Sequence, residues 1–209
     1  MRKGTYNLNG MKLVVSGLAL MTIATLATNV VDLWKDINIV KMANIGVHFL
    51  AWIFIILGLV GAKRYRTEFK KTFFIGIVGA ISLIVESILI YNSLKLGNGG
   101  LTFIEIDVMF ADYINTLCMA MTYYLGIRGV AQLLAKHGEI KMAKKSFSMS
   151  KWGITIIFAS MIIIPLAFIF PDILKYIIAG IGIIMATGMQ LFMCYYIDKG
   201  YKVLHGRNI

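Results

Sequence analysis

One acidic residue lies inside a long apolar segment of this chain. Glu86 is the only formally charged residue between positions 72 and 94. A carboxylate in the hydrocarbon core of a membrane costs on the order of 3 kcal/mol even on mild insertion scales. Gly79, Ser82 and Ser93 share one helical stripe with Glu86. We therefore expect this stripe to face other helices or water, and the Ile and Leu residues to face lipid.

Polar residues in three further apolar segments are predicted to lie at the depth of Glu86. At about 1.5 Å of rise per residue, they fall within roughly 3–12 Å of the outer membrane boundary. Binding a small cation, a proton or a cationic solute there requires such groups, because paired charge must offset the desolvation of the ligand. The candidate ligand-binding residues are Glu86, His48, Asp112, Asn115, Asn29 and Thr25.

The same residues would also suit a buried hydrogen-bond network that joins the helices. Asn44, His48 and Ala51 form a small and polar stripe on the second apolar segment. Antiparallel neighbours joined by a short loop usually pack together, so we expect this stripe to face the one that carries Glu86. His48 would then lie within hydrogen-bonding reach, or one water, of the Glu86 carboxylate.

The elements that position these residues are predicted to be transmembrane helices. The chain has 209 residues, of which 59% are hydrophobic and only 15% are charged, against about a quarter in soluble domains. About 20 residues cross the hydrocarbon core. The runs that meet this length are 13–31, 42–62, 72–94, 108–127, 152–170 and 176–197. These runs predict an all-α, polytopic bundle of six transmembrane helices that forms one integral membrane domain over residues 1–209.

The basic residues predict the orientation of the bundle. The formal net charge is +11, and most of the 21 Lys and Arg residues fall in alternate connections and at both ends of the chain. The positive-inside rule then places the N-terminus and the C-terminus in the cytoplasm, as in a multi-pass protein of the cell membrane. The basic excess indicates topology and attraction to anionic lipid headgroups of the bilayer, and no nucleic-acid partner is expected.

Two features bear on the ends of the helices. The fourth helix is expected to continue beyond the membrane to Lys136 and to end at His137-Gly138, with Tyr123 and Tyr124 at the inner membrane interface.

Gly61, Gly129 and Gly200 recur near the cytoplasmic ends of the even-numbered runs. Three successive helical hairpins would give this period, and so would unrelated glycines near helix ends.

Catalytic and cofactor signatures are missing from the sequence. It contains no His-Glu-x-x-His zinc motif, no Gly-x-Ser-x-Gly turn and no Gly-rich phosphate loop. Cys118 and Cys194 differ in predicted depth by roughly 10 Å, so no disulfide is expected between them. We therefore expect a protein that is not an enzyme and that uses no cofactor and no metal.

Two hypotheses for the function remain. The first is a transporter or channel-type protein that handles a small cationic or protonatable solute through the outer polar layer around Glu86. The second is a non-enzymatic membrane subunit or sensor that docks a partner or anionic lipid through the basic loops at 64–71 and 141–151. A second copy of the chain or another membrane subunit is the protein partner that this architecture allows.

Overall fold

The computed structural model of the chain is built from helices. It describes residues 8–33, 38–96, 101–167 and 169–206, and within these ranges it describes no side chains at 28–33, 38–43, 93–96, 101–109, 172 and 206. The described residues contain no strand. Their helices are α1 (Met11–Leu33), α2 (Asn38–Ala62), α3 (Thr67–Leu96), α4 (Leu101–Lys136), α5 (Ile140–Ala167) and α6 (Asp172–Gly206). The prediction of an all-helical fold is confirmed.

Five of these helices are long and apolar enough to cross a membrane. The candidate spans are Asn44–Ala62, Thr67–Asn92, Phe110–Lys136, Ile140–Ala167 and Ile173–His205. In α1 the described apolar part is the shorter segment Met11–Ala27. Since about 20 apolar residues cover the hydrocarbon core, this is a helical bundle suited to a membrane.

The central helix of the bundle is α4. The most apolar window of α4 is 72% buried, against 22% for α3 and for α5, and its mean hydropathy of 1.2 is the lowest of the five. It packs against α3, α5 and α6. The outer helices instead expose large apolar side chains such as Val78, Ile184 and Phe192. A membrane accounts for this pattern, because lipid tails are as apolar as these side chains.

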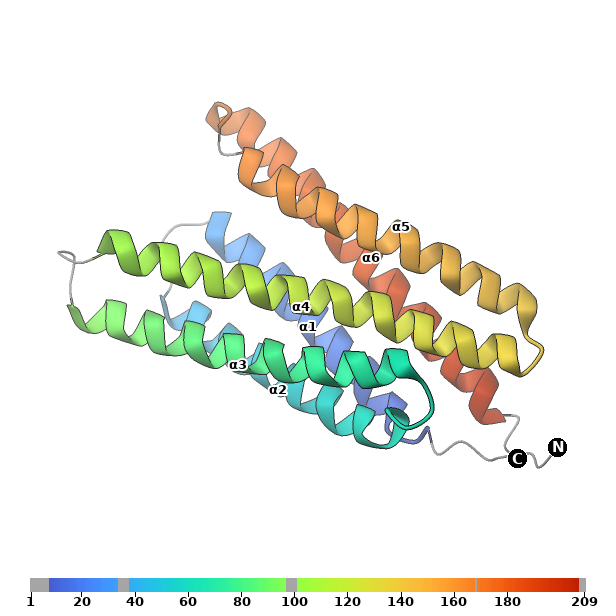
Figure 1. The fold of residues 1–209 in the computed structure, drawn as a ribbon. Helices are drawn as coiled ribbons and strands as arrows, with labels where there is room; N and C mark the ends of the chain where they lie inside the picture. Colours follow the sequence, from blue (N-terminus) through green and yellow to red (C-terminus); the bar gives the residue numbers. More distant parts are fainter. Residues whose placement is uncertain (1–7, 34–37, 97–100, 168, 207–209) are drawn as a thin grey trace.

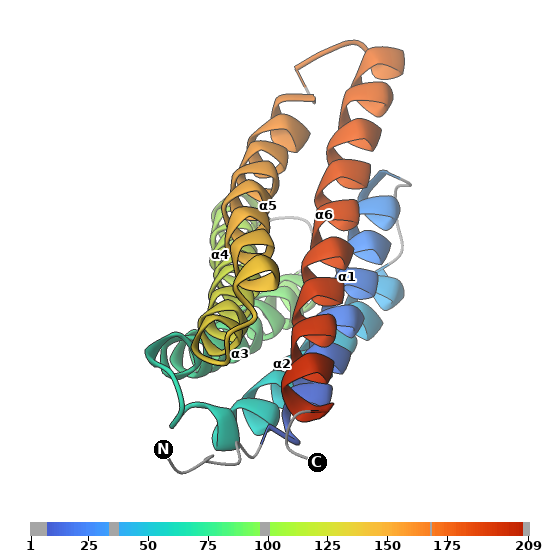
Figure 2. The same ribbon diagram turned by 90° about the vertical axis from the view of Figure 1, so that its right-hand side faces the viewer.

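Consecutive helices pack as pairs, α1 with α2, α3 with α4 and α5 with α6. The start of α1, the end of α6 and the connections α2–α3 and α4–α5 lie at one end of the bundle, at the lower right of Figure 1. We call this the basic end, because Lys63, Arg64, Lys144 and Lys145 lie there. At the opposite end, the tips of α5 and α6 rise away from those of α2, α3 and α4 (Figures 1 and 2).

The turn after α4 explains why this long helix stops where the sequence predicts. Gly138 has a φ of 83°, in the left-handed region that glycine adopts without steric cost. Its N–H donates to the Ala135 carbonyl (3.1 Å), and the Glu139 N–H donates to the Leu134 carbonyl (2.9 Å). These two bonds form a Schellman motif, which ends α4 and lets α5 fold back.

Small residues bring α1 and α2 into backbone contact. A Cβ atom at Gly10 would lie 2.2 Å from the Gly58 carbonyl oxygen, and one at Gly17 would lie 2.7 Å from the Ala51 carbonyl oxygen. Only glycine fits at such an approach. The small-residue stripe of α2 therefore faces α1, and the prediction that this stripe faces the Glu86 stripe of α3 is wrong.

Candidate functional site

His48 is held by α1. The Thr25 Oγ1 donates to the Met21 carbonyl (2.9 Å) and lies 3.4 Å from His48 Nε2. His48 is also hydrogen-bonded to the backbone of Met21. Thr25 Oγ1 also lies 3.4 Å from Met119 Sδ of α4, so α1, α2 and α4 meet at this hydroxyl. One turn away, Asn44 Nδ2 donates to the Ala24 carbonyl (2.9 Å).

Trp52 fills the space between α2 and α3 that the sequence assigned to His48. Its side chain is fully buried, and its ring lies on Gly79, where a Cβ atom would be 2.3 Å from Trp52 Cζ2. Its Nε1 donates to Asn115 Oδ1 on α4 (2.9 Å). One indole thus joins α2, α3 and α4. The structure shows no hydrogen bond between the described side chains of His48 and Glu86, because the two residues face different helices.

Glu86 lies on the face of α3 that packs against α4. It is 9% exposed, and its buried Oε2 has no hydrogen-bond partner. Asp112 of α4 is the nearby charge that acts on it. Asp112 is itself exposed at the surface of the bundle. The α3–α4 pair therefore holds one buried and one exposed carboxylate in electrostatic contact.

The structure thus distributes the predicted layer over two groups. Thr25 and His48 lie between α1 and α2, while Glu86 and Asp112 lie between α3 and α4. Asn115 stands between these groups through its bond to Trp52. The side chain of Asn29 lies outside the described residues.

Sequence reasoning missed a second buried cluster, at the centre of the bundle. The Tyr123 hydroxyl donates to the Leu18 carbonyl (2.6 Å) and lies 2.5 Å from Thr22 Oγ1. Cys194 of α6 is hydrogen-bonded to both side chains. The prediction of Tyr123 at the inner interface is wrong: the residue is fully buried and joins α4 to α1 and α6. The available signal was the polar stripe of α1, in which Thr22 and Thr25 lie three residues apart.

The structure also bears on the predictions for the two cysteines and for metal ligands. Cys118 and Cys194 are both buried and free, so the expectation of no disulfide is confirmed. Among the described residues, no three His, Cys, Asp or Glu side chains are placed to hold a metal ion together.

Two cavities lie at the basic end, away from Glu86 and His48. One measures about 630 Å³ and lies beside the α2–α3 turn. The other measures about 490 Å³ and lies between the start of α1 and the end of α6. In the second cavity Lys202 Nζ pairs with Asp198 Oδ2 (2.6 Å).

The described residues form a helical bundle suited to a membrane, with a buried carboxylate at Glu86. Comparison with protein-family models, with curated proteins and with solved structures gave no match.

Proposed function

We propose that this protein is a six-span integral membrane protein with cytoplasmic termini that binds a small cation, a proton or a cationic solute at Glu86 and carries it across the membrane. The observation that carries the proposal is the buried Oε2 atom of Glu86, which has no hydrogen-bond partner. Buried polar atoms that serve only to hold a fold together are nearly always hydrogen-bonded. An unsatisfied carboxylate oxygen in a membrane helix instead suits a group that takes up its partner from outside.

Asp112 supports this proposal in two ways. As a like charge near Glu86, it makes a bound proton or cation more favourable, because the ligand offsets the repulsion between the carboxylates. Asp112 is also exposed, so it is the more accessible of the two carboxylates. The pair therefore supplies an accessible group and a buried group.

The proposal assigns His48 and Asn115 a supporting role. Both are engaged by neighbouring helices, His48 through Thr25 and Asn115 through Trp52. They hold α1, α2 and α4 around the α3–α4 pair and need not contact the solute.

Cation flux into liposomes tests the proposal. Glu86→Gln keeps the shape of the side chain and removes its charge, and Glu139→Gln makes the same change in the turn after α4. We expect Glu86→Gln to lower the flux of H⁺, Na⁺ or methylammonium at least about tenfold, the effect of about 1.4 kcal/mol on a barrier. Glu139→Gln should retain the wild-type flux.

The alternative hypothesis, a subunit or sensor that docks a partner or lipid, makes the opposite prediction. It requires no solute path, so the wild type and a folded Glu86→Gln variant would show the same flux at every pH. That result would exclude the proposed role of Glu86.

A further inference from the structure

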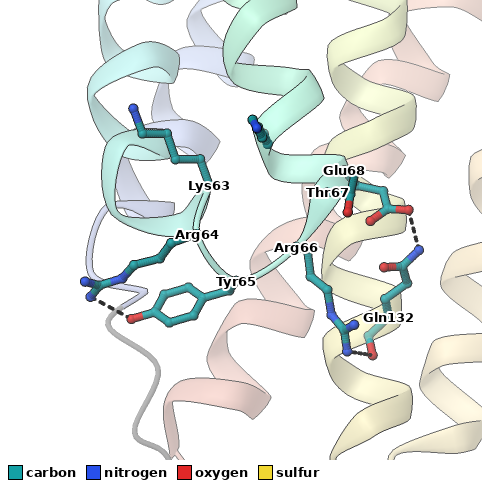
Figure 3. Close-up of a pocket in the computed structure, with 8 residues that line it drawn as sticks. Lys63, Arg64, Tyr65, Arg66, Thr67, Glu68 and Gln132 are labelled. Atoms are coloured by element: carbon teal, nitrogen blue, oxygen red, sulfur yellow. Dashed lines mark hydrogen bonds between the residues drawn. The ribbon is translucent and has the colours of Figure 1, made fainter.

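The cavity of about 630 Å³ at the basic end is built by the turn between α2 and α3 and by one residue of α4 (Figure 3). Its volume is within the range of small-molecule sites, about 300–1,000 Å³. The lining residues are Lys63, Arg64, Tyr65, Arg66, Thr67, Glu68, Lys70 and Gln132. Four of these are cations and one is a carboxylate, so the cavity carries a positive charge.

Three of the four cations of the cavity contact neutral groups. Lys63 Nζ lies 4.0 Å from the centre of the Phe73 ring. Arg64 Nη2 donates to the Tyr65 hydroxyl (2.8 Å). Arg66 Nη2 reaches the Gln132 carbonyl oxygen at 3.5 Å. Rings, hydroxyls and carbonyls position these side chains but leave their charges uncompensated.

Gln132 organises the floor of the cavity. Its side-chain Nε2 donates to Glu68 Oε1, and its backbone carbonyl receives Arg66, as the dashed lines in Figure 3 show. Glu68 is thereby held by an amide. The Arg66 guanidinium makes this one long bond through Nη2, so it keeps other N–H donors for a ligand. An arginine with unused donors in a cationic cavity fits the oxygens of a phosphate group.

The surface beside the cavity distinguishes a lipid from a soluble phosphate compound. Lys70 is exposed, and Phe74, Val78 and Ile81 follow it on the same face of α3, each more than half exposed. This apolar stripe belongs to the candidate span Thr67–Asn92, so the cavity lies where the headgroups of a bilayer would be. A lipid whose phosphate entered the cavity would have its acyl chains along this face of α3.

We propose that the cavity beside the α2–α3 turn binds the phosphate of an anionic lipid headgroup. Arg66 and Lys70 contact the phosphate oxygens, and the acyl chains run along Phe74, Val78 and Ile81. This site lies at the opposite end of α3 from Glu86 and is independent of the proposed cation site.

The test is the thermal unfolding of the full chain in nanodiscs. Nanodiscs of phosphatidylcholine are compared with nanodiscs that also contain phosphatidylglycerol or cardiolipin. The anionic lipids should raise the unfolding temperature, because a ligand of the folded state stabilises that state. Arg66→Gln and Lys70→Gln should each weaken lipid binding about tenfold, the effect of one lost charge-assisted contact. Each variant should therefore show a smaller rise in unfolding temperature than the wild type at the same lipid content.

Lys144→Gln is the matched control, since it removes one exposed cation from α5 at the same end of the bundle. It should retain the full temperature shift. If Lys144→Gln and Lys70→Gln reduced the temperature shift equally, the lipid would be attracted to the basic surface in general, and the proposed site would be overturned. Lys70 is exposed, so its variant remains informative if Arg66→Gln does not fold. An equal shift from glycerol phosphate in phosphatidylcholine nanodiscs would assign the site to a soluble ligand and also overturn the lipid.

Discussion

Trp52 shows at the scale of one residue why the helices meet as they do. An indole in the middle of a membrane span needs an acceptor for its N–H, and Asn115 supplies it at 2.9 Å. It also needs room beside its ring, and Gly79 supplies that. The sequence predicted that Gly79, Ser82 and Glu86 face other helices, and all three are buried, while the side chain of Ser93 lies outside the described residues. It did not predict the role of Trp52, which is one position beyond the predicted stripe of α2.

Trp52→Phe should lower stability by about 1–3 kcal/mol. The change removes the N–H donor, leaves Asn115 Oδ1 buried without that partner and empties space over Gly79. Trp152→Phe is the matched control, since Trp152 is 63% exposed on α5. Chemical unfolding of both variants in detergent micelles checks this, and equal losses would contradict the role of Trp52.

The positions of α2 and α3 were easier to predict from the sequence than the faces through which they pack. Apolar run length predicted the apolar core of each helix, because it depends only on the thickness of a membrane. It did not predict that α5 begins at Ile140, and the basic segment 141–151, which was expected to be a loop, is helical. Helix pairing depends on which side chain enters which gap, and periodicity does not contain that information. His48 and Glu86 share a predicted depth, yet His48 contacts Thr25 of α1, whereas Glu86 lies near Asp112 of α4.

A double-mutant cycle separates the observed pairing from the predicted one. The losses of stability in His48→Leu and Glu86→Leu should add within about 0.5 kcal/mol, because the residues have no shared partner. The stability losses of Glu86→Leu and Asp112→Leu should not add, because removing one carboxylate also removes the repulsion that acts on the other. Unfolding measurements on all five variants decide this. A coupling between His48 and Glu86 larger than that between Glu86 and Asp112 would restore the predicted pair.

The basic end holds the turn between α2 and α3, whereas Glu86 and His48 lie in the other halves of these two helices. Charge distribution predicted this polarity because positive residues gather on one side of a membrane regardless of the fold. The central cluster of Tyr123, Thr22 and Cys194 could not be predicted in this way. Its members lie on three helices far apart in the sequence, and their contact depends on the tertiary arrangement.

Thiol labelling tests the orientation of the whole chain. Cys118 and Cys194 are 9% and 7% exposed, so native labelling should be low. Lys175→Cys, near the start of α6, should react with a membrane-impermeant maleimide from outside intact cells. Lys144→Cys, on α5 at the basic end, should react only after the membrane is opened. The reverse pattern would show that the termini lie outside the cell.

Binding and release of a proton or a cation by the Glu86 carboxylate can be measured directly. Infrared difference spectroscopy of the reconstituted protein records carboxyl bands as Na⁺ is added or as pH is stepped. The wild type and Glu139→Gln should share a difference band that is missing from Glu86→Gln. A folded Glu86→Gln variant with the same difference bands as the wild type would show that Glu86 does not bind the ion.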